Sequence, residues 1–169
     1  MDFTPDCKNC AALCCMALAF DKGEMFAFDK AAGQACQHLC GDHTCGIHAK
    51  LGDIGMQGCI AYSCDGAGQR VTQEVFHGAS WQDDPAVRLR MIDAFNAMRL
   101  VQKNLLLLGA TKPLPLNGAQ RAVRVRLQKA LTPAKGWTED SLKRLHTDGT
   151  LTKLAAFFKS LRDIAPRDP

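Results

Sequence analysis

The chain has 169 residues, of which 47% are hydrophobic and 22% charged, and its formal net charge is +4. This balance is typical of a folded globular protein of ordinary domain size, and it excludes a disordered or collagen-like chain. No run approaches the roughly 18 consecutive apolar residues of a membrane span, so we expect no membrane association.

The first 65 residues contain glycine at short intervals, which favours turns over long elements. We expect one helix over residues 6–19, because a capping residue and a proline lie at its start. Phe26 and Phe28 alternate within residues 23–30, which favours a short strand pair there. A second short helix is expected over residues 45–52.

Helical periodicity dominates the second half of the chain. Pro85 follows two aspartates, and apolar residues then recur at helical spacing as far as Leu108, which predicts one helix of about 25 residues. A proline-containing linker follows. Further helices are expected over residues 118–131 and 138–149 and from Thr150 onwards.

Charge divides the chain into the same two parts. Residues 1–65 contain 4 Lys and Arg against 8 Asp and Glu, whereas residues 66–169 contain 17 against 9. We therefore expect a mainly α fold, in which a small Cys-rich, metal-stabilised module (residues 1–70) is followed by a bundle of about four helices (residues 71–169) that packs on it. So short and glycine-rich a module would be marginally stable without metal.

The nine cysteines all lie between Cys7 and Cys64, and the last 105 residues contain none. The N-terminus is acidic where a secretory signal peptide would be basic. We therefore expect no targeting segment and a cytoplasmic location. In that reducing compartment a dense cysteine cluster binds metal more often than it forms disulfides.

The cysteine spacing suits thiolate ligation. It is Cys7-x2-Cys10-x3-Cys14-Cys15, then Cys36-x3-Cys40-x4-Cys45, then Cys59-x4-Cys64. On a helix the first three cysteines would share one face, and Cys15 would lie about 100° from Cys14. Zinc takes four thiolate or imidazole ligands, and iron–sulfur clusters use the same ligand type. The alternative is a set of buried, apolar thiols.

The order of these cysteines, with Gly58, Tyr62 and the segment Gly66-Ala67-Gly68-Gln69, resembles the zinc- or iron-chelating cysteine-cluster family with the CxxCxxCC start. The resemblance is greatest to the form that precedes the repeats of bacterial pentapeptide-repeat proteins, and it covers roughly residues 6–70. It implies a set of eight metal ligands. These are Cys7, Cys10, Cys14, Cys15, Cys36, Cys45, Cys59 and Cys64.

Two features depart from the family pattern. Three residues separate Cys10 from Cys14 where the pattern has two, and Cys40 is additional. The pentapeptide repeats are absent, so the roles of the repeat solenoid are not implied. The eight pattern cysteines fill two four-coordinate centres, or one centre with the remaining thiols buried.

Other residues near the cysteines leave alternatives open. Three roles are open for the nearby histidines: metal ligand, hydrogen-bond donor to a bound thiolate, or ordinary surface residue. These histidines are His38, His43 and His48. A nucleophilic Cys40–His43 pair has no supporting sequence context. Gly66-x-Gly68 is too short for a dinucleotide loop and is interpreted as a turn.

The segment after residue 117 is basic. Its cations indicate a solvated helix face, a site for a protein partner, or a weakly supported nucleic-acid site. They are Arg121, Arg124, Arg126 and Lys129, followed by Lys143 and Arg144.

The sequence therefore predicts a metal-binding cysteine-cluster protein that acts as a non-enzymatic binding or adaptor protein for an unknown protein partner. Structural zinc is the expected metal. The alternative is an iron–sulfur protein with a redox or enzyme-accessory role. Because zinc has no redox chemistry, the identity of the metal separates the two hypotheses.

Overall fold

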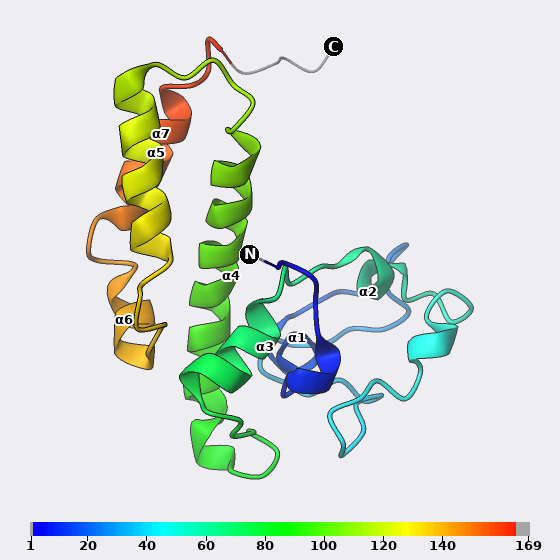
Figure 1. Cartoon of the computed structure of the whole chain (residues 1–169). Helices are drawn as coiled ribbons and strands as arrows, with labels where there is room; N and C mark the ends of the chain where they lie inside the picture. Colours follow the sequence, from blue (N-terminus) through cyan, green and yellow to red (C-terminus); the bar gives the residue numbers. More distant parts are fainter. Residues whose placement is uncertain (1, 165–169) are drawn as a thin grey trace.

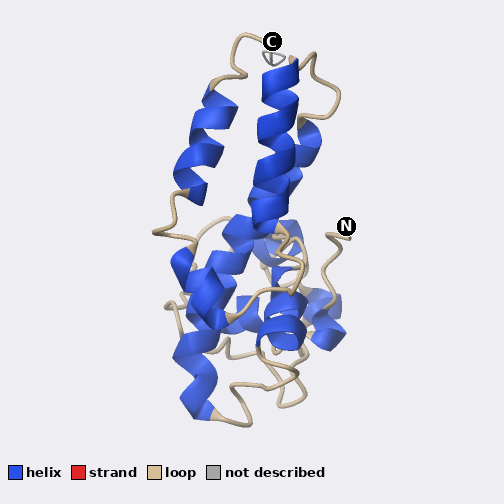
Figure 2. Ribbon diagram, turned by 60° about the vertical axis from the view of Figure 1, so that its left-hand side comes forward, coloured by secondary structure: helices blue, strands red, loops and turns tan. Residues whose placement is uncertain are grey.

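The computed structural model describes residues 2–164 and confirms a mainly α fold. Within that range the chain forms seven α-helical segments and no β-strand (Figure 2). The helices are α1 (Leu13–Ala17), α2 (Gln57–Ala61), α3 (Ala67–Arg70), α4 (Arg88–Ala110), α5 (Gly118–Leu131), α6 (Glu139–Arg144) and α7 (Thr150–Lys159).

The long helix α4 lies between the two parts of the molecule. Figure 1 shows α5, α6 and α7 on one side of it and the Cys-rich segment with α1, α2 and α3 on the other. Helices α1, α3, α5 and α6 pack directly on α4, and α7 packs on α5. The Cys-rich segment (residues 2–65) is thus attached mainly through α4 to the helical part, which consists of α4 to α7.

Local signals at the start of α4 explain its position. The Asp84 side chain accepts a hydrogen bond from the Ala86 backbone N–H at 2.9 Å and begins a 3₁₀ turn, Pro85–Val87, that leads into the helix. The apolar residues predicted for its inner face are buried, including Met91 and Phe95. In the described part of the chain, neither α4 nor any other helix is both long and apolar enough to span a bilayer.

Capping boxes fix the starts of α5 and α6. The Asn117 side chain accepts from the Gln120 N–H, and the Gln120 side chain accepts from the Asn117 N–H, both at 2.9 Å. Thr138 and Ser141 form the same reciprocal pair before α6. The predicted bounds of α5 and the start of α7 are confirmed, whereas α6 ends earlier than expected, at Arg144.

The expected helix over residues 6–19 is wrong. A short 3₁₀ turn, Cys7–Asn9, and helix α1 are separated by Ala12, whose φ is +51°. Tertiary contacts break the helix, because the backbone N–H and carbonyl of Ala11 bond to side chains that are distant in sequence. Its N–H donates to Thr72 Oγ1 at 3.0 Å, and its carbonyl accepts from Trp81 Nε1 at 2.7 Å.

The expected strand pair over residues 23–30 is also absent. An isolated bridge joins Phe20 to Lys30, and the Gly23 N–H donates to the Phe26 carbonyl at 2.9 Å within a turn. The alternating aromatic rings serve packing instead. The Phe20 ring centroid lies 4.3 Å from that of Phe26 and 5.4 Å from that of Phe28. The helix expected over 45–52 is a single 3₁₀ turn, His48–Lys50.

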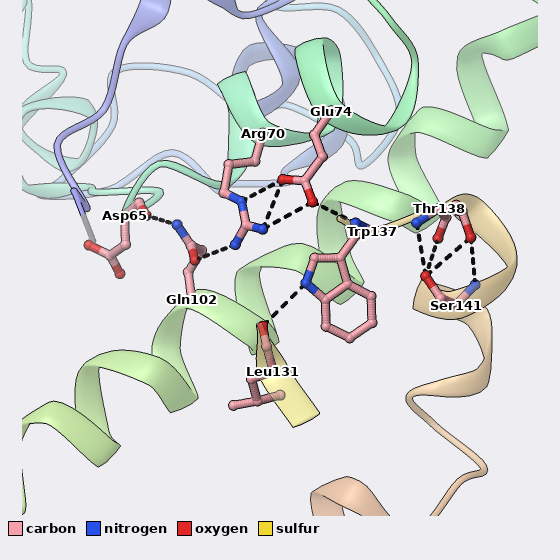
Figure 3. A network of polar contacts seen from close by, with 8 residues as sticks. All are labelled: Asp65, Arg70, Glu74, Gln102, Leu131, Trp137, Thr138 and Ser141. Atoms are coloured by element: carbon pink, nitrogen blue, oxygen red, sulfur yellow. Dashed lines mark hydrogen bonds and ion pairs between the residues drawn. The ribbon is translucent and has the colours of Figure 1, made fainter. Parts of the chain in front are cut away.

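One polar network joins the end of the Cys-rich segment to the helical part (Figure 3). Gln102 on α4 is fully buried; its Nε2 donates to the Asp65 carbonyl at 2.6 Å, and its Oε1 accepts from Arg70 Nη1 at 3.1 Å. Arg70 pairs with Glu74 at 2.8 Å, and Glu74 accepts from the Trp137 backbone N–H at 2.5 Å. The network therefore links three segments that are distant in sequence: residues 65–74, Gln102 on α4 and Trp137.

Candidate metal centre

The turn that carries Cys7 and Cys10 is fixed by backbone bonds. The Asp6 side chain accepts from the Lys8 N–H at 3.1 Å, and the Cys10 N–H donates to the Cys7 carbonyl at 3.4 Å. Burial raises the pKa of Cys10 to about 11, although a hydrogen bond from the Leu13 N–H to its sulfur lowers it. That N–H stabilises the thiolate form of Cys10, the form that binds a metal.

Gly68 on α3 brings Cys10 and Cys64 together. A Cβ atom placed on Gly68 would lie 2.6 Å from the Cys10 sulfur and 3.9 Å from the Cys64 sulfur. Both sulfurs therefore lie against the same backbone position. The sequence interpretation of Gly66-x-Gly68 as a turn is correct for Gly66, whose φ is +82°, but it missed the role of Gly68.

The remaining pattern cysteines come from loops and α2. The Cys36 N–H donates to the Cys15 carbonyl at 3.0 Å, which holds Cys36 beside α1. Cys59 lies on α2, and the Gly58 N–H before it donates to the Met25 carbonyl at 2.8 Å. Cys45 forms an isolated bridge with Leu39.

Charge interactions connect the thiols of Cys7, Cys10, Cys14 and Cys64. Burial raises the pKa of Cys7, and the charges of Cys14 and Cys64 raise it further, followed by Asp6 and Cys45. The charges of Cys14, Cys64 and Cys7 raise the pKa of Cys10 in the same way. Cys14 and Cys64 thus act on both Cys7 and Cys10, and Cys45 acts on Cys7 as well.

The other thiols group around α2 and Lys30. Burial raises the pKa of Cys59, and the charges of Cys36, Cys14 and Cys45 add to this effect. The thiols whose charges act on Lys30 are those of Cys36, Cys15, Cys14 and Cys59. The charge of Cys14 thus acts on Cys7, Cys10, Cys59 and Lys30.

Cys14 and Cys15 are in direct contact. Their sulfurs are 4.0 Å apart, and the hydrogen bond between the two thiols is the main reason that the pKa of Cys14 is raised, ahead of burial. Four thiolates on one zinc ion have neighbouring sulfurs about 3.8 Å apart, given a Zn–S bond of about 2.3 Å. The Cys14–Cys15 pair therefore fits a shared zinc ion or two adjoining centres.

Among residues 2–164, no group of three or more His, Cys, Asp or Glu side chains is already arranged to hold a metal ion. The donor set itself suits zinc or iron, because the cluster consists of thiols and the nine cysteines are free rather than paired in disulfides.

Cys40 and the histidines are placed differently. Cys40 is exposed, as Cys7 and Cys59 are, and its sulfur lies against Gly46, where an added Cβ would be 3.1 Å from it. His43 Nδ1 bonds to Gln82 Oε1, and Gln82 Nε2 donates to the Cys40 carbonyl at 3.3 Å, which docks this loop on the segment before α4. The His38 ring packs against Phe28 at 5.5 Å between centroids. His48 lies in the 3₁₀ turn before Leu51.

Two residues that position the cluster were missed by sequence reasoning. Thr72 and Trp81 hold the backbone of Ala11, which lies between Cys10 and Cys14. Thr72 Oγ1 also donates to the Gly68 carbonyl at 3.0 Å. One hydroxyl therefore bonds both to Ala11, the residue after Cys10, and to Gly68, which lies against the Cys10 sulfur. No local pattern marks such contacts, because the partners are about 60 or more residues apart in sequence.

Comparison with known proteins identifies one informative relative. The chain is 40% identical over 104 residues to the uncharacterized protein YybG of Bacillus subtilis, and the match covers 62% of this chain and 37% of that protein. The match thus spans little more than a third of the length of YybG. No family model and no solved structure matches the chain.

Proposed function

We propose that the chain is a metal-binding protein whose cysteine cluster holds structural zinc in two neighbouring thiolate centres. One centre consists of Cys7, Cys10, Cys14 and Cys64, and the other of Cys15, Cys36, Cys45 and Cys59. The observation that carries the proposal is a dense set of free thiols, whose charges act on one another, in a segment that lacks an apolar core.

That lack of a core is evident in the burial of side chains. Between Leu18 and Asp65 the buried side chains are those of Lys30, Leu51 and Met56, and neither apolar one joins the continuous core around α4. Such a segment cannot offset its conformational entropy by hydrophobic burial. Metal ligation supplies free energy to folding, since an unfolded chain has no preformed site.

Metal analysis and chelation test this proposal. Protein purified without oxygen should contain about two zinc ions per chain by elemental analysis. After a strong chelator removes them, hydrogen exchange should become fast in residues 6–65, whereas circular dichroism should show that α4–α7 remain helical. A Cys-rich segment that stays protected after verified metal loss would overturn the structural role. Iron and inorganic sulfide in place of zinc would support the redox alternative.

The adaptor part of the proposal is based on α5. This helix carries Arg121, Arg124, Arg126 and Lys129 but no acidic residue, and the ion pairs of residues 2–164 do not involve it. Val125 is 45% exposed among these cations. An acidic segment of a protein partner suits such a surface.

Fluorescence anisotropy separates the possible partners of α5. The wild-type protein should bind a labelled polyglutamate peptide more tightly than a DNA or RNA oligonucleotide of equal charge. Reversing Arg126 to Glu should abolish the difference, whereas reversing Lys103, outside α5, serves as a control. Tighter binding of the oligonucleotide would favour nucleic acid and contradict the protein-partner proposal.

A further inference from the structure

Lys30 is a buried lysine inside the Cys-rich segment. It is 5% exposed, and its backbone pairs with Phe20 in an isolated bridge. Its Nζ donates to the carbonyls of Met16 at 3.3 Å, Leu18, and Ala31 at 3.4 Å. These three bonds use the three N–H donors of the ammonium group.

The ammonium group lacks a carboxylate partner in the described part of the chain, where the ion pairs are Arg70–Glu74 and Arg90–Glu139. The Met16 carbonyl that it bonds belongs to the residue directly after Cys15, and the Cys36 N–H donates to the Cys15 carbonyl at 3.0 Å, so the ammonium group lies beside the chain that carries these thiols. The charges of Cys36, Cys15, Cys14 and Cys59 act on it. A buried charge is costly unless another charge or fixed dipoles compensate for it. Three carbonyl dipoles supply part of this compensation, and thiolates supply the full opposite charge.

We propose that Lys30 is the counter-charge of the thiolate-bound metal centre to which Cys15, Cys36 and Cys59 belong. This inference rests on the proposed function. A zinc ion with four thiolates carries a net charge of −2, which is itself unfavourable in a site of low dielectric. The ammonium group reduces the net charge of that environment to −1. Because its donors are already taken by carbonyls, Lys30 acts through charge and not through a hydrogen bond to sulfur.

This role distinguishes Lys30 from the other lysines of the segment. Lys22 lies in the same loop and is exposed, so water screens its charge. Lys30 is held among three carbonyls of the chain around α1, where its charge has a fixed position. Removing the charge at position 30 should therefore weaken metal binding at one centre, and removing it at position 22 should not.

The test compares the metal affinity and the metal-free stability of matched variants. Lys30→Met removes the charge at similar length, Lys30→Gln removes the charge and keeps two donors, and Lys22→Met is the control. Competition with a chromophoric chelator should show that one of the two zinc ions is held roughly 10–100-fold more weakly in both Lys30 variants, the scale of changes around metal ligands. The two variants should lose less stability in the metal-free protein than in the zinc-loaded protein, because removal of the buried charge there offsets part of the loss of the three carbonyl hydrogen bonds.

Each outcome decides the role of Lys30. Zinc affinity equal to that of the wild type overturns the proposal. An equal loss of stability with and without metal, or loss of the fold in both variants, shows a purely structural role and also overturns it. A wild-type protein that binds no metal contradicts the proposed function itself, and elemental analysis of that protein is therefore carried out first.

Discussion

Substitution of Gly68 by Ala perturbs the proposed metal site without removing a ligand. The added Cβ would lie 2.6 Å from the Cys10 sulfur and 3.6 Å from the Cys10 Cβ. Carbon and sulfur atoms that are not bonded do not approach so closely, so the sulfur must move by roughly 1 Å to regain ordinary contact. The Cys10 backbone is held by its bond to Cys7, and the movement therefore falls on the thiol.

A displacement of this size exceeds the tolerance of a metal–sulfur bond, which is about 0.2 Å. We expect the affinity of the Cys7–Cys10–Cys14–Cys64 centre for zinc to fall at least about 10–100-fold. The metal-free protein should change much less. Alanine favours the helical position by up to about 1 kcal/mol, and this gain offsets part of the roughly 1–3 kcal/mol cost of overpacking.

Chelator competition measures the affinity, and urea unfolding with and without zinc measures the two stabilities. Gly109→Ala is the matched control, because Gly109 also lies in a helix and a Cβ there meets nothing within 4 Å. That variant should keep its zinc affinity and gain stability. If Gly68→Ala binds both zinc ions as tightly as the wild type, Cys10 is not a ligand and the assigned centre is wrong.

Three further outcomes are expected. Cys15→Ser should lower the zinc content by about one ion per chain while Cys40→Ser leaves it unchanged; full zinc content in the first variant would remove Cys15 from the ligand set. In the zinc-loaded protein, mild alkylation followed by mass mapping should place the label on the exposed Cys40, because a metal-bound thiolate is protected; label on Cys36 with Cys40 protected would exchange their roles. Thr72→Val should reduce the free energy of unfolding by about 1–3 kcal/mol, since it leaves the buried Ala11 N–H without a partner; chemical denaturation measures this loss, and Thr72→Ser should retain most of the stability.

The second half of the fold was predictable because its signals are local. Asn117 and Gln120 form their capping box within three residues, so the sequence alone locates the start of α5. The same holds for Asp84 before α4. In these helices the local preference and the packing of the apolar face agree, and the predicted bounds are therefore close to the observed ones.

The Cys-rich segment was less predictable because distant residues determine its backbone. Nothing near Ala11 breaks the helical pattern, and the break comes from Thr72 and Trp81. The order of the cysteines sets Cys40 apart as additional, and this assignment stays a prediction, since Cys40 shares its exposure with Cys7 and Cys59. Which thiols lie together within the cluster depends on close approaches such as that of Gly68 to Cys10, and spacing alone does not encode them.

The Gln102 network raises the question of whether the metal centre and the helical part are energetically coupled. Gln102→Leu would leave the Asp65 carbonyl and one Arg70 donor without their partner, at a cost of about 1–3 kcal/mol or more, because the donor is charged. Asp65 directly follows Cys64 and has a left-handed backbone, with φ at +51°. The Gln102 bond therefore fixes the strained residue next to a proposed ligand.

If that bond positions Cys64, Gln102→Leu should lower both the free energy of unfolding and the zinc affinity. Glu74→Gln provides the comparison, because Glu74 belongs to the same network but bonds to Arg70 and Trp137, away from the cysteines. It should lower stability and leave zinc affinity unchanged. Denaturation and chelator competition on the two variants measure both quantities. If both variants bind zinc as tightly as the wild type, the Gln102 bond stabilises the Cys-rich segment without positioning Cys64.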